Sequence, residues 1–192
     1  MSITNLIERN IEEHKNTIEH FAQSQMQSIQ TIGQKLVRSL QNGGTVFWCG
    51  NGGSAADSQH LSAELVGRFK KNRRPLRSLA LSTDTSVLTC IANDFSYDDV
   101  FSRQIQAIGR ADDVLVGIST SGNSENVGRA ILAANEIGVT TVALLGKGGG
   151  KIQKIATDSL VVPSETTARI QEVHILVGHI LCDIIELEMG FA

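Results

Sequence analysis

Five short apolar runs, separated by segments long enough to form helices, constrain the fold of this chain more than any other feature. The runs are rich in β-branched residues and read TVFWC, SLALS, DVLVGI, TTVALL and SLVV. This alternation is typical of a parallel sheet whose crossover helices cover both faces. The chain has 192 residues, within the range of one domain. The predicted fold is therefore α/β, with a five-stranded parallel sheet in a single domain.

The first 44 residues have a different pattern. Apolar residues recur at near-helical spacing over residues 3–21 and again over 26–40, which predicts two amphipathic helices. A Gly-Gly pair beginning at Gly43 follows, where a helix C-cap is expected. The predicted organisation is a helical pair over 1–44, belonging to the same domain as the α/β part over 45–192. The apolar faces of the pair predict packing between subunits.

Composition excludes several classes of function. The formal net charge of −3 gives no electrostatic reason to expect a nucleic-acid partner. The N-terminal segment has acidic residues throughout and no apolar stretch long enough for a signal peptide or a membrane span. The three cysteines form no CxxC pair and are interpreted as small core residues. We therefore expect a cytoplasmic protein with no membrane partner.

The loop after the first predicted strand reads GNGGS, from Gly50 to Ser54. Ser54 is the expected N-cap of the next helix. Glycines in such a loop let backbone amides approach an anion or a sugar closely. The same letters also satisfy a loose dinucleotide-binding pattern, and a tight turn alone would need similar residues. A ligand role for this loop stays open at this point.

The loop after DVLVGI reads STSGNS, from Ser119 to Ser124, and precedes a predicted helix. Its hydroxyls and amides converge on one helix N-terminus, which favours a phosphate monoester. The alternative is a polar cap whose hydroxyls only satisfy backbone groups, but four hydroxyl residues in six exceed that need. A further glycine-rich segment, GKGGGK, lacks the P-loop spacing and is interpreted as a plain connection.

Two helices carry acid–base residues. His60 and Glu64 are spaced i, i+4, so their side chains share one face of the helix after the first loop. The last predicted helix, about residues 168–189, carries four polar candidates: Gln171, Glu172, His174 and His179. Spacing alone does not exclude an ordinary hydrogen-bonded pair on the first helix, or a buried histidine satisfied by a carbonyl on the last. Nor does it choose between Gln171 and Glu172 as the companion of His179.

Several segments resemble a known family over the whole length of the chain. They are GNGGSAADSQH, HLSAELVGRF, ANDF, FSRQ, ISTSGNS and ARIQEVHILVGHILC. These segments are similar to those of the bacterial phosphoheptose isomerases of the sugar isomerase (SIS) domain superfamily. The resemblance implies a single SIS-type domain with a flavodoxin-like sheet, and a homotetramer.

The resemblance also implies roles for particular residues. It implies one zinc ion per subunit, held by His60, Glu64, Gln171 and His179. It assigns proton transfer to Glu64 and His179. The implied substrate contacts are Asn51, Gly52, Gly53, Glu64, Asn93, Asp94, Ser119, Thr120, Ser121, Ser124 and Gln171. Some relatives have an acidic residue where this chain has Ala168, so an auxiliary acid is absent there.

The implied activity is aldose–ketose isomerisation of sedoheptulose 7-phosphate to D-glycero-D-manno-heptose 7-phosphate. In the family this is the first step towards ADP-heptose and the heptose of the lipopolysaccharide core. One alternative is a non-catalytic SIS-domain protein that binds the replication initiator, and the presence of Glu64 and His179 argues for the enzyme. A nucleotide-dependent oxidoreductase is a weaker alternative, because the chain leaves no room for a separate substrate domain.

Overall fold

All five strands of the sheet are parallel, in the order β2-β1-β3-β4-β5. The computed structural model describes residues 1–191. The strands are β1 (Val46–Gly50), β2 (Ser78–Ala80), β3 (Val114–Ser119), β4 (Thr140–Leu145) and β5 (Asp158–Val161). This order is that of the flavodoxin-like doubly wound sheets. The predicted α/β class and the five strands are confirmed.

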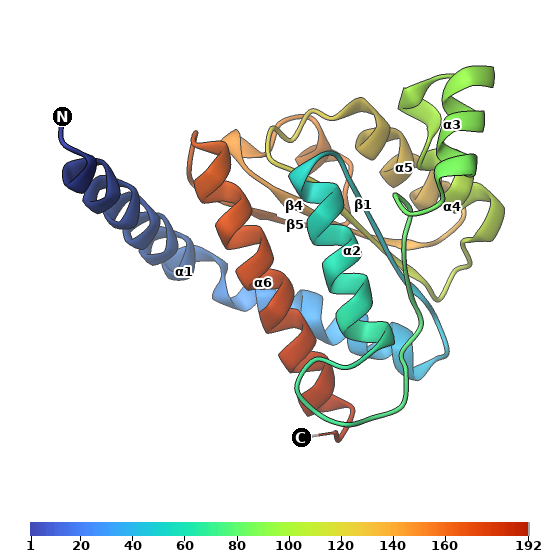
Figure 1. Ribbon diagram of the computed structural model, residues 1–192. Helices are drawn as coiled ribbons and strands as arrows, with labels where there is room; N and C mark the ends of the chain where they lie inside the picture. Colours follow the sequence, from blue (N-terminus) through green and yellow to red (C-terminus); the bar gives the residue numbers. More distant parts are fainter. Residues whose placement is uncertain (192) are drawn as a thin grey trace.

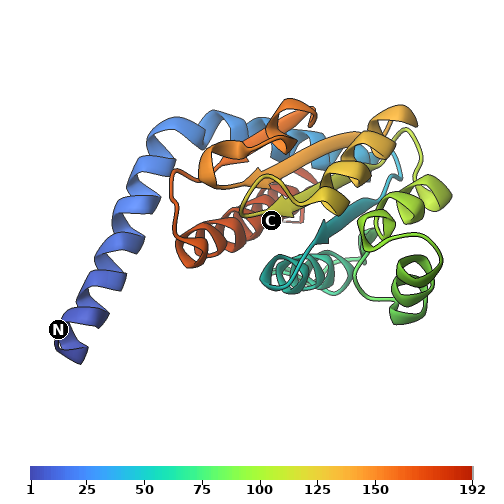
Figure 2. The ribbon, with the colours of Figure 1, turned by 90° about the horizontal axis from the view of Figure 1, so that it is seen from above.

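Helices cover both faces of the sheet, as Figures 1 and 2 show. On one face lie α1 (Ile3–Gln41), α2 (Gly53–Val66) and α6 (Thr167–Glu188). On the other lie α3 (Thr85–Asp94), α4 (Ser102–Ile108) and α5 (Glu125–Glu136). The short 3-10 helices are η1 (Tyr97–Asp99), η2 (Lys147–Gly149) and η3 (Ile152–Lys154). Each face of the sheet has its own hydrophobic core, and successive strand residues point to opposite faces. Trp48 packs into the core under α1, α2 and α6, while Phe47 and Cys49 pack into the core under α3, α4 and α5.

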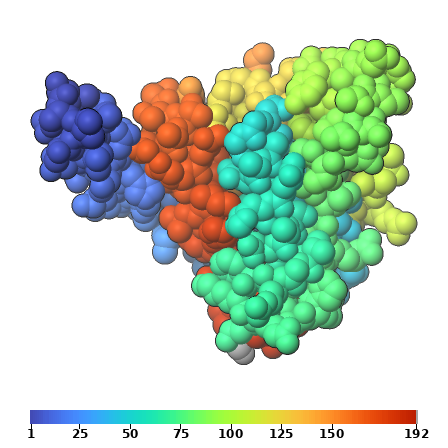
Figure 3. Space-filling view, in the orientation of Figure 1, coloured from blue at the N-terminus to red at the C-terminus, as the bar shows by residue number. Residues whose placement is uncertain are grey.

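The predicted N-terminal pair of helices is wrong: residues 3–41 form one continuous helix. The two apolar sets are joined by Ala22, Gln23, Ser24 and Gln25, and this junction contains no glycine or proline that would end a helix. Figure 2 shows that α1 instead changes direction along its length. Its N-terminal part projects from the body of the protein, which the space-filling view in Figure 3 also shows. The helix ends before Gly43, as predicted.

Helix α6 lies in close contact with α1 and α2, and glycines make this approach possible. A Cβ at Gly33 of α1 would lie 2.8 Å from Ile184 Cγ2. A Cβ at Gly178 of α6 would lie 2.5 Å from both terminal methyl groups of Leu61 on α2. Both distances are too short for real side-chain contacts, so the three helices pack more closely than larger residues would permit.

Two smaller expectations differ from the structure, and a third agrees with it. Helix α2 begins one residue before Ser54, with Gly52 as its N-cap at a φ of 55° that favours glycine. The side chain of Cys90 is exposed, whereas Cys49 and Cys182 are buried as expected. Helix α6 covers 167–188, within a residue of the predicted bounds. Over residues 1–191, no helix is both long and apolar enough to span a membrane.

Candidate active site

The first two candidate loops lie side by side, because β1 and β3 are neighbours in the sheet. After β1 the chain turns into α2 on one face, and after β3 it turns into α5 on the other. The two loops therefore leave the carboxyl edge of the sheet in opposite directions. This is the switch point at which ligands bind in open α/β sheets. The predicted sugar and phosphate loops thus meet at one place.

A pair of amides joins the two loops. Asn51 Nδ2 donates to Asn126 Oδ1 at 2.8 Å, and Asn126 Nδ2 donates back to Asn51 Oδ1 at 2.9 Å. The hydroxyl of Tyr97, on η1, donates to the same Asn51 oxygen at 3.1 Å. Asn126 is buried in the first turn of α5. The sequence analysis did not predict a role for Asn126 or Tyr97. A polar residue among the apolar positions of α5 was a signal that could have indicated Asn126.

The hydroxyls of Ser119, Ser121 and Ser124 lie together, and that of Ser121 also accepts from the backbone N–H of Asn123 at 3.1 Å. Ser119 Oγ lies 2.9 Å from Ser124 Oγ and 3.4 Å from Ser121 Oγ. Ser124 occupies the N-cap position, but its side chain makes no capping hydrogen bond. The alternative of a purely structural cap therefore does not account for this hydroxyl. A loop with converging hydroxyls at the start of a 12-residue helix is suited to an anion.

The GKGGGK segment does more than connect two elements, because it packs against the second loop. The backbone N–H groups of Ile152 and Lys151 donate to Gly122 O and Asn123 Oδ1, at 3.0 and 3.1 Å. A Cβ on Gly150 would overlap the Gly122 carbonyl, and Gly150 has a φ of 56°. Only glycine allows this approach of two backbones. The segment therefore supports the shape of the candidate phosphate loop.

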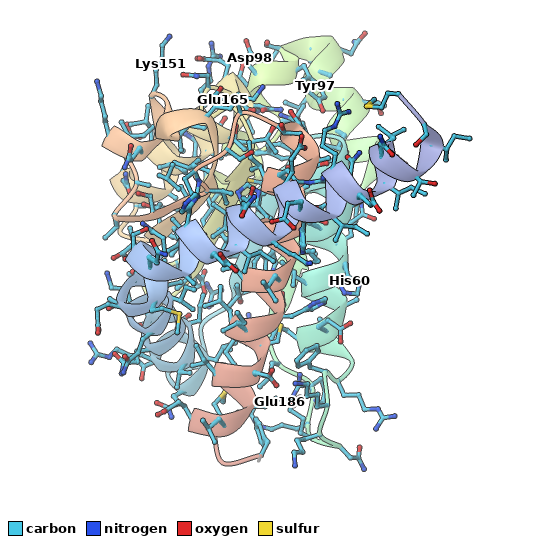
Figure 4. The ribbon with its side chains drawn as sticks, turned by 90° about the vertical axis from the view of Figure 1, so that its left-hand side faces the viewer. His60, Tyr97, Asp98, Lys151, Glu165 and Glu186 are labelled. Carbon is cyan, nitrogen blue, oxygen red and sulfur yellow. The ribbon has the colours of Figure 1, made fainter. Side chains whose placement is uncertain are left out.

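Three of the four predicted metal ligands come together between α2 and α6. His60 Nε2 lies 2.9 Å from His179 Nε2 and 3.4 Å from Glu64 Oε1. His60 is about half exposed and Glu64 about one-fifth exposed, at 48% and 21% of their side chains. Figure 4 shows His60 on the outer side of α2. The i, i+4 pair and the last-helix histidine thus form one cluster around His60, and the catalytic roles of Glu64 and His179 stay a prediction.

The other polar residues of α6 face elsewhere. The Gln171 side chain lies against Gly53, at the start of α2, and the helical rise places it about 12 Å along α6 from His179. Glu172 turns towards α1, where its carboxylate accepts from Arg169 and lies 2.6 Å from His14 Nδ1. His174 Nε2 lies 3.1 Å from Leu145 O. Its burial lowers its pKa to about 4, so it is a neutral core residue.

Asp57 is a further acidic residue beside this cluster. Its Oδ2 atom is buried and has no hydrogen-bond partner among the described residues. Burial raises the pKa of the Asp57 carboxyl, and the nearby His60 and His179 act in the opposite direction. The structure thus places an unpaired carboxyl oxygen near two imidazoles.

The cluster has the nitrogen and oxygen donors that a divalent metal ion needs. Two nitrogen ligands of a tetrahedral zinc ion lie about 3.3 Å apart for Zn–N bonds of 2.0–2.1 Å. The His60 nitrogen has near that spacing to both His179 and Glu64. Within residues 1–191, no group of three His, Cys, Asp or Glu side chains forms a ready-made cage. The donor chemistry and two of the spacings therefore fit a metal, while a joint site with Gln171 stays a prediction.

Asn93 and Asp94 lie at the end of α3, apart from the histidine cluster. Both are exposed, and Asn93 Nδ2 donates to Asp94 Oδ1 at 2.8 Å. The chain after them leads to Tyr97, which contacts Asn51. Their predicted contact with substrate stays a prediction. A cavity of about 580 Å³ lies at the opposite edge of the sheet and includes none of the predicted site residues.

Comparison with known proteins agrees with this geometry. The SIS domain family model matches residues 10–146. Phosphoheptose isomerase from Helicobacter pylori strain P12 is 48% identical over 184 residues, which cover 96% of each chain. The chain belongs to the phosphoheptose isomerase family. The solved phosphoheptose isomerase structure from Neisseria gonorrhoeae is 43% identical, with a TM-score of 0.91 over 96% of this chain and 99% of that one.

A second solved phosphoheptose isomerase, from Francisella tularensis, is 35% identical. It superposes with a TM-score of 0.94 and covers 97% of this chain and 100% of its own. The likeness to phosphoheptose isomerases therefore includes the long α1 helix and the last helix, as well as the sheet. The predicted membership of this family is confirmed.

Proposed function

We propose that this protein is an aldose–ketose isomerase that converts sedoheptulose 7-phosphate to D-glycero-D-manno-heptose 7-phosphate. The observation that carries the proposal is the meeting of Glu64, His60 and His179 in one cluster, on helices that begin at or near the sugar and phosphate loops. The similar proteins named phosphoheptose isomerase support this substrate class. In bacteria with such heptoses, the product would lead to ADP-heptose and the lipopolysaccharide core.

The reaction needs one base and one acid. Glu64 removes a proton from C1 of the ketose while His179 donates a proton to the C2 carbonyl oxygen, which gives an enediol. The proton then returns from Glu64 to C2, and His179 recovers a proton from the C1 hydroxyl as the aldehyde forms. Exchange of the two roles between these side chains gives the same net reaction. A carboxylate and an imidazole placed together are sufficient for both transfers.

The other end of the substrate fits the second loop. Ser119, Ser121 and Ser124 present hydroxyls to the start of α5, where a phosphate dianion is favoured by the helix dipole. The helical rise places His60 about 10 Å along α2 from Gly53. An extended seven-carbon phosphate ester has a similar length. We propose that the phosphate binds at the switch point and that the sugar extends along α2 towards the histidine cluster.

We further propose that the cluster holds one zinc ion, with His60, Glu64 and His179 as ligands and Gln171 as the predicted fourth. Imidazole, carboxylate and amide form a donor set that zinc accepts. The unpaired Asp57 oxygen beside these residues favours a cation in the same place. A bound zinc ion would polarise the sugar oxygens at C1 and C2.

The proposed assembly is a cytoplasmic homotetramer. Apolar side chains on the projecting part of α1 are exposed, among them Ile3 at 79%, Ile7 at 54% and Ile11 at 51%. Contiguous apolar surface of this kind is usually covered by another chain. A bundle of α1 helices from several subunits would cover it symmetrically.

The proposed function is tested by incubating the purified protein with sedoheptulose 7-phosphate in D₂O. We expect the aldose phosphate to form and deuterium to appear at C2, as an enediol intermediate requires. The control is the same mixture with Glu64→Gln protein. No aldose and no exchange at C1 or C2 in the presence of zinc would refute the proposal and favour a non-catalytic SIS-domain protein.

A further inference from the structure

The imidazole of His179 is stacked against an aromatic side chain that has no role in the reaction described above. Phe69 lies almost parallel to it, with ring centroids 5.4 Å apart and an interplanar angle of 16°. His60 meets the same imidazole in a T-shaped arrangement, at 5.2 Å and 76°. One face of His179 is therefore covered by Phe69, while its Nε2 edge points to His60.

The segment that carries Phe69 is anchored to α6 by a buried carboxylate and by an exposed ion pair between Lys70 Nζ and Asp183 Oδ2 at 2.7 Å. Glu186 is only 3% exposed. Its two oxygens accept from the backbone N–H groups of Phe69, Lys70 and Lys71 at 3.0–3.2 Å, and from Arg73 Nε at 3.0 Å. Hydrogen bonds to a carboxylate are among the stronger ones in proteins. In Figure 1 this segment follows α2 and passes the lower end of α6.

The same segment is also tied to α2. The Arg73 side chain is fully buried, and its remaining nitrogens donate to Glu64 O at 2.8 Å and Leu65 O at 2.9 Å. Arg73 thus satisfies carbonyls in the last turn of the helix that carries Glu64. The Arg73–Glu186 ion pair therefore joins the ends of both helices of the cluster, and Phe69 lies between that ion pair and His179. Figure 4 shows Glu186 at the end of α6, beyond His60.

We propose that Phe69 is a positioning residue for His179, and that Glu186 acts on catalysis by holding Phe69 in place. This inference rests on the proposed function, in which His179 transfers a proton. An imidazole turns about two side-chain bonds, and the stacked ring restricts both. A small misplacement of a catalytic group lowers the rate of the chemical step while leaving much of the substrate binding intact.

A purely space-filling role for Phe69 predicts different behaviour. If Phe69 only fills apolar volume, leucine should replace it well, because its volume is similar. If the flat ring orients the imidazole, tyrosine should replace it well and leucine should not. Three substitutions at one position therefore separate the two roles.

The experiment measures kcat and KM for Phe69→Ala, Phe69→Leu and Phe69→Tyr. We expect kcat to fall about 10-fold for alanine and leucine with KM changed less than about 3-fold, and tyrosine to stay near the wild type. Lys71→Ala is the matched control, because Lys71 contacts Glu186 through its backbone N–H alone. An unchanged kcat for Phe69→Ala, or full activity for Phe69→Leu, would overturn the inference.

A second variant tests the role of Glu186. Glu186→Gln should lower kcat by a similar factor, and the double variant with Phe69→Ala should be no slower than Phe69→Ala alone, because both changes act on one contact. If the losses of kcat in the two single variants multiply in the double variant, Glu186 does not act through Phe69. Circular dichroism of each variant checks that the fold is retained.

A spectroscopic measurement separates this inference from the proposed function. In protein labelled at the histidine rings, the His179 proton resonances should carry a ring-current shift from Phe69, identified by their loss in His179→Gln. The shift should disappear in Phe69→Leu and persist in Phe69→Tyr. A wild-type protein that shows the shift but no isomerase activity would refute the proposed function alone. An active wild type without the shift would refute the positioning role.

Discussion

Asn51 and Asn126 exchange two hydrogen bonds across the gap between the β1 and β3 loops. One residue belongs to the loop that we predict to contact the sugar, and the other belongs to the helix that follows the phosphate loop. This reciprocal pair sets the orientation of the Asn51 amide before any ligand arrives. It also joins the two loops directly, so we expect a change in one loop to affect the other.

We predict that Asn126→Ala destabilises the protein and weakens the use of substrate together. Removing one partner leaves the half-buried Asn51 amide incompletely bonded, which costs about 1–3 kcal/mol. Chemical denaturation should show this loss, and KM for sedoheptulose 7-phosphate should rise. Glu136→Ala, at the exposed end of the same helix, is the control. A KM equal to that of the wild type would contradict the coupling of the two loops.

Glu64→Gln and His179→Gln should each lower kcat at least about 100-fold, because both proton transfers need their partner. Circular dichroism should show an intact fold, since neither side chain is part of a buried core cluster. The matched controls are Glu136→Gln and His20→Gln at exposed positions. Either site variant with near-normal turnover would remove that residue from the proposed mechanism.

The hydroxyls of the second loop should distinguish phosphorylated from free heptulose. Changing Ser121 and Ser124 to alanine together should raise KM for sedoheptulose 7-phosphate by about 10-fold or more, because charge-assisted hydrogen bonds to the dianion are lost. Ser86→Ala, an exposed hydroxyl on α3, is the control. Equal use of sedoheptulose without phosphate by the wild type would show that the loop does not recognise phosphate.

Protein purified without chelators should contain about one divalent metal ion per subunit, because the donor set of the cluster suits zinc. Elemental analysis measures this content directly. His60→Ala should remove most of the metal, whereas His20→Ala should retain it. A protein that contains no divalent metal, and whose activity does not respond to added zinc, would contradict the metal proposal while leaving the isomerase proposal to its own test.

The exposed apolar side chains of α1 should be required for assembly. The double variant Ile7→Glu with Ile11→Glu places charges in the proposed helix bundle and should convert the tetramer to smaller species. Light scattering after gel filtration measures the mass in solution. Glu8→Ala with Glu12→Ala changes exposed acidic positions of the same turns and should leave the mass unchanged. A wild-type protein that is a fully active monomer at micromolar concentration would refute the tetramer.

Sequence patterns predicted the sheet well because a buried parallel strand must be apolar along its whole length. All six residues of β3 and all five of β1 are buried. The same reasoning failed at α1, where the interval between two apolar sets looked like a boundary but contains no helix breaker. Helix periodicity reports which face is buried, and it cannot report whether a helix bends or ends.

Local spacing predicted that His60 and Glu64 share one face of α2, but it did not exclude an ordinary hydrogen-bonded pair. The family resemblance was needed to select His179 among the polar residues of α6. A helical wheel does not show that His174 contacts the Leu145 carbonyl or that Glu172 accepts from Arg169. Phe69, Asn126 and Glu186 were missed. Their contacts join segments far apart in the sequence, so no local sequence pattern predicts them.

The close contacts that α6 makes at two glycines restrict which parts of the candidate site can be substituted. Gly178 lets Leu61 of α2 approach one side of α6, and Gly33 of α1 lies against Ile184 on the same helix. A side chain at Gly178 would force Leu61 to shift, and a side chain at Gly33 would force Ile184 to shift, so either change would disturb the packing of α6. We therefore expect the spacing of the proposed catalytic pair to depend on residues that take no part in the chemistry. Adaptation to other sugar phosphates would have to occur in the loops at the sheet edge, where residues can be exchanged without separating the two helices.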